Sequence, residues 1–450
     1  MRKRSWALLW LALLTASAIY AGNSLPNPVI SRNGAGTAST FSNAGNIDLN
    51  NPFFGNLGTN GRTCASCHVS SNAWGIEPSE VQARFRASDG LDPIFRTNDG
   101  ANCPSADVST LGARRTAYSL LLDKGLIRVS FPVPAGADFQ IIAIDDPYSC
   151  AETTPVTPAH YRRPLPSTNL PFLTTVMWDG RESHPGNTLR ENLRQQAIDA
   201  TMGHAEGAVV PTDQQLQAIV NAEFALFTAQ ETSLSAGALD KGGATGGARK
   251  LSTQEFYVGI NDVLGADPNG RPFTPVVFTT YNAWKDSTNP AKAQIARGQE
   301  IFNTHPLMIT DVKGLNDALG VPALNGTCTT CHDSPNVGNH SVPLAIDIGV
   351  SDPGRPGLDL SGLPVYTVQC VATGETRVTT DLGRAMVTGK CADVGKMKGP
   401  ILRGLSARAP YFHNGGARTL RDVVEFYDAR FNMGLSEQDK KDLVAFLGTL

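Results

Sequence analysis

The sequence predicts a mostly α-helical chain with two domains in tandem and inserted loops and short β segments, on the basis of three observations. The pattern C-x-x-C-H occurs twice, at residues 64–68 and 328–332 of 450. Two capped apolar stripes of helical spacing follow the second copy, near the C-terminus. Between the copies, residues 127–144 alternate apolar and polar side chains around Pro and Gly, which is typical of an inserted hairpin.

The repeated motif predicts two covalently bound haem c groups. C-x-x-C-H is the attachment signature of c-type haem, in which two thiols bond to the porphyrin and the adjacent His reaches the iron. The residues concerned are Cys64, Cys67 and His68 in the first copy and Cys328, Cys331 and His332 in the second. The alternative is a Cys₄ zinc site assembled from the two pairs, although such a site needs no His after each second cysteine.

The N-terminus is typical of a secretory signal peptide over residues 1–21. Three basic residues precede an apolar stretch, Trp6 to Ala18, and cleavage after Ala18 or Ala21 would fit. An uncleaved anchor is the alternative. We therefore expect a periplasmic protein of a Gram-negative type of cell, soluble once processed, with a homodimer left open. The net charge of −3 suggests no nucleic-acid partner.

Four cysteines remain outside the two motifs, and they allow three pairings. We expect Cys103–Cys150 and Cys370–Cys391, because each of these pairs closes a local loop. The periplasm permits disulfides. The hairpin expected at 127–144 would then lie inside a disulfide-closed insertion.

The expected domains are residues 22–289 and 290–450. The second begins near Pro290, where residues 296–302 resemble the short helix that precedes haem attachment in cytochrome c domains. At its end, Thr419 with Asp422 and Ser436 with Asp439 form capping patterns before two apolar stripes. Both domains are expected to be mostly helical, because the porphyrin itself fills much of such a small core.

Three segments resemble the superfamily of bacterial dihaem cytochrome c peroxidases, which includes the MauG-type enzymes. The first is the ordered pair of C-x-x-C-H motifs, and the second is W-D-G-R at 178–181. The third and most specific is K-G-P-I-L-R-G-L at 398–405 followed by P-Y-F-H-N-G-G at 410–416. The resemblance implies two cytochrome c-type domains, with peroxide reacting at the N-terminal haem and the C-terminal haem supplying electrons.

The resemblance also implies roles for single residues. Trp178 would lie between the haems and carry electrons. Ordinary peroxidases of the family carry Met on the far side of the second haem, whereas MauG-type enzymes carry Tyr, and an ungapped count puts Tyr427 there, with Met433 as the alternative. His413 would lie near a propionate or between the haems. The family's Ca²⁺ site would use the carbonyls of Arg408 and Pro410 and an upstream Asn, for which Asn169 is the nearest.

The far side of the first haem departs from the family pattern. His160 is the first His after His68 and lies closer to Trp178 than the family's distal His, so we expect an open, five-coordinate haem, with His160 as the alternative ligand. Thr201 stands where the family has its catalytic Glu. His204 and Glu206 are the nearby polar side chains that could replace it as the acid–base group.

The expected function is that of a peroxide-dependent oxidoreductase. Hydrogen peroxide would be reduced with electrons from a small redox protein, a cytochrome c or a cupredoxin. Alternatively, the electrons would come from residues of a partner protein, as in MauG-type enzymes. A dihaem oxygenase and a non-catalytic electron carrier are the remaining alternatives.

Overall fold

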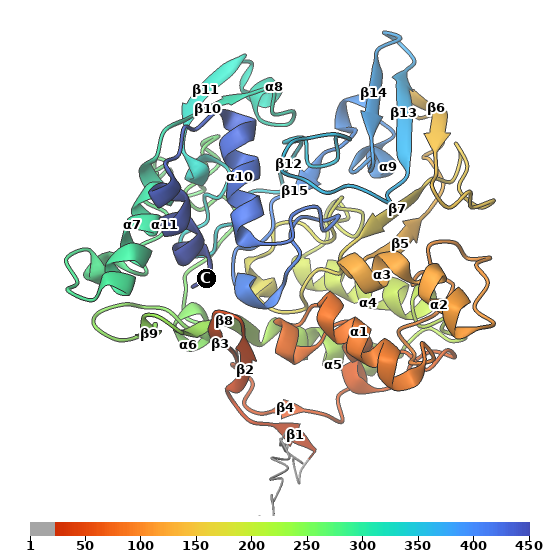
Figure 1. Ribbon diagram of the computed structural model, residues 1–450, viewed down its shortest axis with the longest axis horizontal. Helices are drawn as coiled ribbons and strands as arrows, with labels where there is room; N and C mark the ends of the chain where they lie inside the picture. Colours follow the sequence, from red (N-terminus) through yellow and green to blue (C-terminus); the bar gives the residue numbers. More distant parts are fainter. Residues whose placement is uncertain (1–22) are drawn as a thin grey trace, which may run out of the picture.

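The computed structural model describes residues 23–450, so the expected signal peptide lies outside the described residues. Figure 1 shows helices α1 to α5 gathered on one side and α7, α10 and α11 on the other. In the same view β6, β13 and β14 stand together at one end. Within residues 23–450, no helix is long and apolar enough to cross a membrane.

The elements before residue 290 surround the first motif. The strands are β1 Ser24–Leu25, β2 Val29–Asn33, β3 Gly36–Ser42, β4 Ile47–Asp48, β5 Ile127–Ser130, β6 Phe139–Asp145, β7 Ala159–Arg162, β8 Leu226–Ser233 and β9 Gly237–Ala238. The helices are α1 Pro78–Ser88, α2 Leu111–Ala117, α3 Ser119–Lys124, α4 Leu189–Gly203, α5 Asp213–Phe224 and α6 Ala248–Leu251. Short 3₁₀ turns are η1 Pro52–Phe54, η2 Cys64–Ser66, η3 Ser70–Asn72, η4 Leu170–Phe172 and η5 Asn282–Trp284.

The elements from residue 290 onward surround the second motif. The helices are α7 Pro290–Thr304, α8 Asn316–Leu319, α9 Ala385–Thr388, α10 Leu420–Phe431 and α11 Glu437–Leu447. The strands are β10 Leu307–Thr310, β11 Ala323–Gly326, β12 Ala345–Ile346, β13 Val365–Cys370, β14 Thr376–Thr379 and β15 Met397–Lys398. The 3₁₀ turns are η6 Cys328–Thr330, η7 Cys391–Asp393 and η8 Leu405–Ala407.

The helices predicted around the second motif are confirmed. Helix α7 covers residues 296–302, and α10 and α11 begin at capping boxes formed by Thr419 with Asp422 and by Ser436 with Asp439. Helices α7 and α11 pack closely where Gly298 meets the carbonyl of Asp442. A Cβ at Gly298 would lie 2.0 Å from that oxygen, so glycine is required there.

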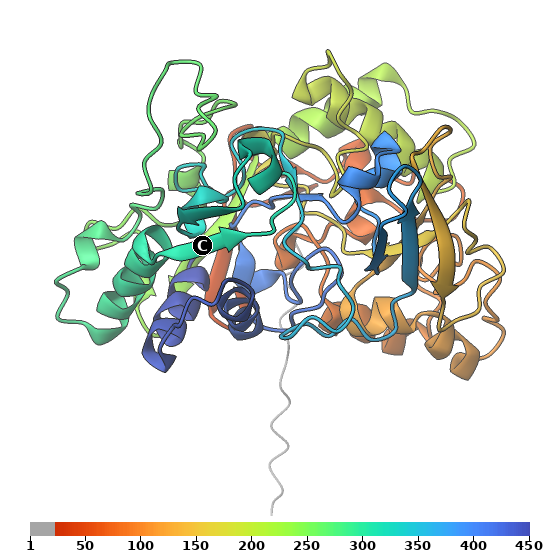
Figure 2. The ribbon, with the colours of Figure 1, turned by 90° about the horizontal axis from the view of Figure 1, so that it is seen from above.

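The expectation of a mostly helical chain is met only in part. The described residues also contain six small sheets, among them β2-β3-β8-β9 and β14-β13-β6. Residues 127–144 do contain two strands, but the predicted hairpin is wrong. Strand β5 pairs with β7 instead. Strand β6 pairs with β13, which follows the second motif in the sequence, as Figures 1 and 2 show. The apolar face of β6, Phe139 and Ile141, packs with Tyr366 and Val368 of β13, and this packing decides the partner.

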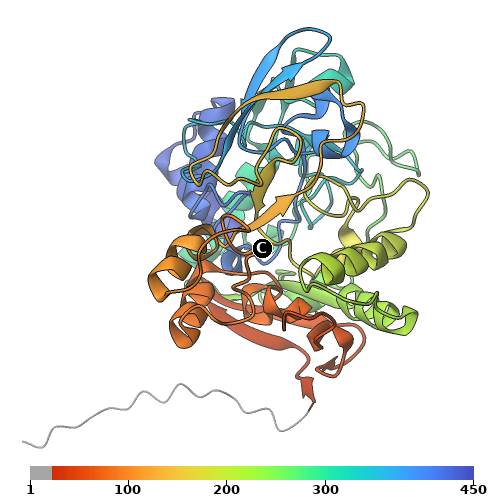
Figure 3. The ribbon, with the colours of Figure 1, turned by 90° about the vertical axis from the view of Figure 1, so that its right-hand side faces the viewer.

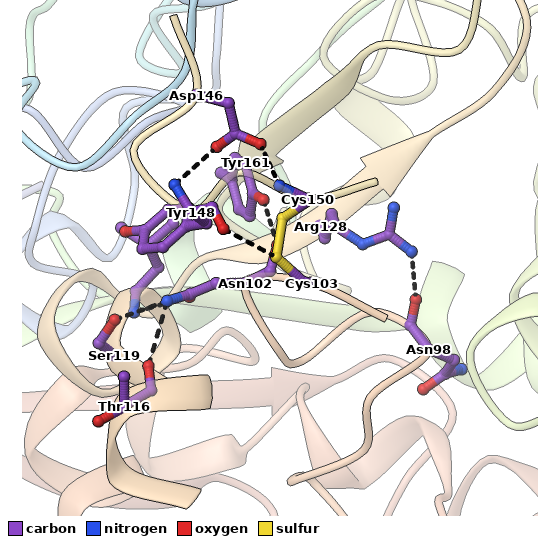
Figure 4. Close-up of a disulfide and its surroundings, with 11 residues drawn as sticks. Asn98, Asn102, Cys103, Thr116, Ser119, Arg128, Asp146, Tyr148, Cys150 and Tyr161 are labelled. Atoms are coloured by element: carbon purple, nitrogen blue, oxygen red, sulfur yellow. Dashed lines mark hydrogen bonds between the residues drawn. A yellow bond between two sulfur atoms is a disulfide. The ribbon is translucent and has the colours of Figure 1, made fainter. Parts of the chain in front are cut away.

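Both predicted disulfides, Cys103–Cys150 and Cys370–Cys391, are confirmed. Figure 4 shows the first, with Asp146 accepting from the backbone N–H of Cys150 at 2.9 Å. On the other side of the bridge, Arg128 donates to the carbonyl of Asn98 at 2.9 Å. The disulfide and Arg128 together hold the segment 98–103 in place. In Figure 3 this orange part of the chain lies beside helices α1 to α3.

Candidate functional site

The first motif forms a single tight turn. The N–H of Thr63 donates to the Ser66 hydroxyl at 3.0 Å, and the N–H of His68 donates to the Cys64 carbonyl at 3.0 Å. The Nδ1 atom of His68 lies 3.1 Å from the carbonyl of Trp74. Since a carbonyl only accepts, Nδ1 carries the proton, and Nε2 is the nitrogen left for a metal ion.

The second motif repeats this arrangement. Thr327 and Thr330 form the same bond at 3.0 Å, and the N–H of His332 donates to the Cys328 carbonyl at 3.1 Å. The Nδ1 atom of His332 lies 2.7 Å from the carbonyl of Gly338. In both motifs this carbonyl belongs to the sixth residue after the His. Burial lowers the pKa of both ring systems, to about 4 for His68, so both are neutral as a metal ligand requires.

The four motif cysteines are not bridged, although the other four form disulfides. Cys64 and Cys67 line one cavity with His68, called here the first cavity. Cys328 and Cys331 line another with His332, the second cavity. Among the described residues no group of three or more His, Cys, Asp or Glu could hold a metal ion. The motifs therefore do not converge on a Cys₄ zinc set.

The cavities fit the group that the motifs predict. Both are lined mainly by apolar side chains, and each presents two free thiols and a His with a fixed tautomer. Burial raises the pKa of Cys64, Cys328 and Cys331 to about 12, so these side chains are neutral thiols when no metal ion is bound. Covalent haem c, held by the thiols and ligated by His68 or His332, agrees with this donor set.

At the first cavity the buried Asp99 pairs with His204, whose side chain is 39% exposed. Asp99 accepts from Nδ1 of His204 at 2.5 Å, and Arg62 forms an ion pair with the same carboxylate. Burial alone would raise the pKa of Asp99, but His204 and Arg62 outweigh it and lower the pKa below its ordinary value. Asn60 and Arg62 also donate to the backbone carbonyl of His204, at 2.9 and 3.1 Å. His204 is thus fixed at both its ring and its backbone, with Nε2 left free.

The other polar side chains expected near the first haem lie differently. The Thr201 hydroxyl lines the cavity but donates to the Ala197 carbonyl at 2.8 Å. Glu206 is exposed on a backbone turn with φ of +52°, outside the cavity lining, so the structure corrects its expected place in the pocket. His160 is fully buried against Tyr366, away from the first cavity. Neither of its ring nitrogens forms a hydrogen bond with the described residues, although Nε2 lies 3.8 Å from a carboxylate oxygen of Asp381.

A thin wall separates the two cavities. Met177 lines the first cavity, whereas the next residue, Trp178, lines the second. Lys398 and Pro400 line both. The amine of Lys398 donates to the Thr175 carbonyl at 2.9 Å, and burial lowers its pKa to about 7.

Trp178 is held from two sides. Its indole N–H donates to the Arg163 carbonyl at 2.8 Å, and its ring meets His413 edge-on. His413 is buried, lines the second cavity, and lies 3.3 Å from the Ser351 hydroxyl. Burial lowers the pKa of His413 to about 4, although Asp381, 3.7 Å away, opposes this. The neutral imidazole is therefore a fixed dipole beside the indole.

The two alternatives predicted for the far side of the second haem are Tyr427 on α10 and Met433 after its end. Both side chains line the second cavity, so the choice between them stays a prediction. Burial raises the pKa of the Tyr427 phenol, so it keeps its proton unless a bound cation replaces it. Within residues 23–450 the structure shows no hydrogen bond to its hydroxyl, which leaves that oxygen free for a ligand role.

Two of the groups expected to bind Ca²⁺, the Arg408 carbonyl and the Asn169 side chain, form hydrogen bonds within the protein. The Arg163 guanidinium donates to the carbonyls of Arg408 and Ala409 at 3.2 and 3.3 Å and to that of Lys124 at 2.7 Å. The amide of Asn169 is paired with the backbone of Thr228 at 2.9 Å in both directions. A cation is thus already present at these carbonyls, and the calcium site stays a prediction.

Sequence reasoning missed several residues that line the cavities, namely Asp99, Gln196, Glu223, His340 and Lys398. Most are far in sequence from any motif. Asp99 meets His204 across 105 positions, for which a single sequence offers no signal.

No protein-family model matches the chain. The cytochrome-c peroxidase IdrP2 of Denitromonas iodatirespirans is 35% identical over 142 residues, covering 28% of this chain and 36% of the relative. The cytochrome-c peroxidase IdrP1 of the same organism is 26% identical over 334 residues, covering 66% of this chain and 85% of the relative. The cytochrome c551 peroxidase of Nitrosomonas europaea is 33% identical over 27% of this chain and 30% of its own.

Two solved structures also align. A MauG-like protein associated with microbial copper homeostasis covers 64% of this chain and 75% of its own at 15% identity and a TM-score of 0.34. Kuenenia stuttgartiensis hydrazine synthase covers 83% and 93% at 17% identity and a TM-score of 0.32. Neither alignment supports a conclusion about this chain.

All of these curated relatives are cytochrome-c peroxidases, which supports the resemblance of the chain to the superfamily of bacterial dihaem cytochrome c peroxidases. The chain spans only 36% and 38% of the length of the first two curated relatives, so similarity leaves its activity to be proposed.

Proposed function

We propose that this chain is an exported, periplasmic oxidoreductase that binds two haem c groups and reduces hydrogen peroxide. The observation that carries the proposal is the pair of cavities on either side of one wall, each with two free thiols and an oriented His. The names of the curated relatives support the peroxidase reaction. When bound, haem c supplies an iron centre that exchanges electrons and binds peroxide oxygen.

We assign proton transfer to residues of the first cavity and electron transfer to residues of the wall and the second cavity. Reduction of one peroxide to two waters consumes two electrons and two protons. In the first cavity His204, oriented by Asp99, is placed to move a proton at Nε2. Trp178, in the wall, is the aromatic side chain through which electrons would pass from the second cavity. Tyr427, or Met433 in its place, would be the far ligand of the second haem.

The electron donor decides between two related functions. A small cytochrome c or cupredoxin would make the protein a detoxifying peroxidase. The unbonded hydroxyl of Tyr427 in the second cavity instead favours a MauG-type enzyme, which takes electrons from residues of a partner protein. An anionic oxygen ligand stabilises ferric iron and lowers the reduction potential.

The test uses the full chain expressed with haem c maturation. We expect two haems per chain and consumption of peroxide when a reduced small cytochrome is supplied. Cys64→Ser/Cys67→Ser should retain one haem and lose the reaction with peroxide. The matched variant Cys328→Ser/Cys331→Ser should also retain one haem, react with peroxide, and fail to turn over. A wild-type protein with two haems that does not react with peroxide would contradict the proposal.

A further inference from the structure

Glu223 occupies an apolar position of helix α5. The inner face of this helix is formed by Leu216, Ile219 and Val220, which are at most 3% exposed. Residues at i, i+3, i+4 and i+7 lie on one face of a helix, and Glu223 completes this series. It is itself 7% exposed. A carboxyl group therefore stands where the helix pattern calls for a hydrocarbon side chain.

Within residues 23–450 the carboxyl group of Glu223 has no partner. Its Oε2 atom is buried without a hydrogen bond, and no Lys, Arg or His of that range forms an ion pair with it. Burial raises the pKa of Glu223 to about 8, and no neighbouring charge opposes the rise. The group is therefore a neutral acid at pH 7. A buried polar group without a partner destabilises the fold, so a role outside the fold explains its presence.

Glu223 lines the first cavity together with Cys64, His68 and His204. Among residues 23–450 the only other carboxylate in this lining is Asp99, which is bound to both Arg62 and His204. Thr201, which stands at the family's acid position, cannot supply an acidic proton. The carboxyl group without a partner in the first cavity is therefore on α5, whereas the sequence pattern places the acid on α4, at Thr201.

We propose that Glu223 is the acid that holds and delivers a proton in the first cavity. This proposal rests on the proposed function. The carboxyl donates its proton to the peroxide oxygen that departs, so that an O–H bond forms as the O–O bond breaks and the oxygen leaves as water. The carboxylate then takes a proton from His204 or from water. One of the two protons consumed per peroxide passes through Glu223, and both electrons come from the redox-protein donor.

The experiment compares four forms of the holoprotein: wild type, Glu223→Gln, Glu223→Leu and the control Glu255→Gln, whose side chain is exposed. All should bind two haems. The rate constant for the first reaction with peroxide should fall about 100-fold or more in both Glu223 variants and stay unchanged in the control. Glu223→Leu should unfold at a higher temperature than wild type, because it completes the apolar face. If Glu223 had only a structural role, its variants would lose thermal stability and the rate of reaction with peroxide together.

A second readout does not depend on turnover. The infrared difference spectrum between wild type and Glu223→Gln should show the loss of one protonated carboxylic acid band, and the difference between wild type and Glu255→Gln should show no such loss. If the variants react with peroxide as fast as wild type, or no band is lost in Glu223→Gln, the role of Glu223 is overturned while the proposed function stands. If wild type itself does not react with peroxide, both the proposed function and the proposed role of Glu223 are wrong.

Discussion

The imidazole of His413 stands edge-on to the indole of Trp178, with ring centroids 6.1 Å apart and an angle of 61° between the planes. With the bond from the indole N–H to Arg163, this contact fixes the tryptophan in the wall between the cavities. The position of the proposed electron relay is therefore set by the protein.

Replacing Trp178 by Phe tests that relay. Trp178→Phe should bind both haems and react normally with peroxide at the first, but re-reduction from the second should slow by about 10-fold or more, because electron transfer falls steeply when a bridging ring is lost or displaced. Stopped-flow absorption separates the two steps. Trp284→Phe is the control, since Trp284 also donates its indole N–H to a carbonyl but lies away from the wall. Equal slowing in both variants would count against the relay.

Asp99→Asn tests the orientation of His204. The amide keeps the size of the carboxylate but no longer holds the proton on Nδ1, so the rate with peroxide should fall about 10- to 100-fold. The variant Asp92→Asn serves as comparison, because Asp92 pairs with Arg84 outside the cavity lining. A normal rate in Asp99→Asn would remove His204 from the proposed mechanism.

Tyr427→Phe and Met433→Leu distinguish the two ligands proposed for the second haem. If Tyr427 is the ligand, only Tyr427→Phe changes the ferric absorption and EPR spectra of that haem and raises its reduction potential, because an anionic oxygen donor is lost. A spectrum that changes only in Met433→Leu would assign the methionine instead.

Stability should depend on pH through His160. Burial lowers the pKa of His160 in the folded state to about 4, although Asp381 opposes the change, whereas an unfolded His titrates near about 6.5. Between these values only the unfolded chain binds the proton, so the free energy of unfolding falls as the pH drops through this window, by about 3 kcal/mol in all. Urea unfolding of His160→Leu should lack this part of the slope. His184→Leu, at an exposed position, should retain it.

Chelation tests the calcium prediction. Because Arg163 already donates to the carbonyls of Arg408 and Ala409, EGTA should leave the peroxide reaction unchanged. Arg163→Met should lower the free energy of unfolding by about 3 kcal/mol, since it leaves several buried carbonyls without a donor. A loss of activity in EGTA that added Ca²⁺ restores would show that calcium is bound.

Local patterns predicted much of the site. The caps at Thr419 and Ser436 and both disulfide pairings depend on spacing along the chain, and they are confirmed. The prediction for Tyr427 comes from counting along a helix, and this residue does line the second cavity. In all these features the residues that define them belong to one local segment of the chain.

Features that depend on tertiary packing were not predictable. Strand β6 has the alternation of a hairpin strand, but its apolar face is buried only by β13, more than 200 residues later. Glu206 is exposed whereas Glu223 is buried, and no motif marks this difference. The interrupted stripe of α5 was a usable signal, because a glutamate after Leu216, Ile219 and Val220 breaks an apolar face.

The pairing of β6 with β13 has a consequence for how the protein can be divided. The first proposed domain contributes β6 to this sheet and the second contributes β13 and β14, so separation would leave β6 without a partner and one edge of β13 unpaired. Halves produced separately would each expose an unpaired edge and tend to aggregate or to find each other. A chain nicked between them would instead remain one particle. The two C-x-x-C-H motifs repeat one local arrangement, yet the strand pairing joins the two halves of the chain into one folding unit.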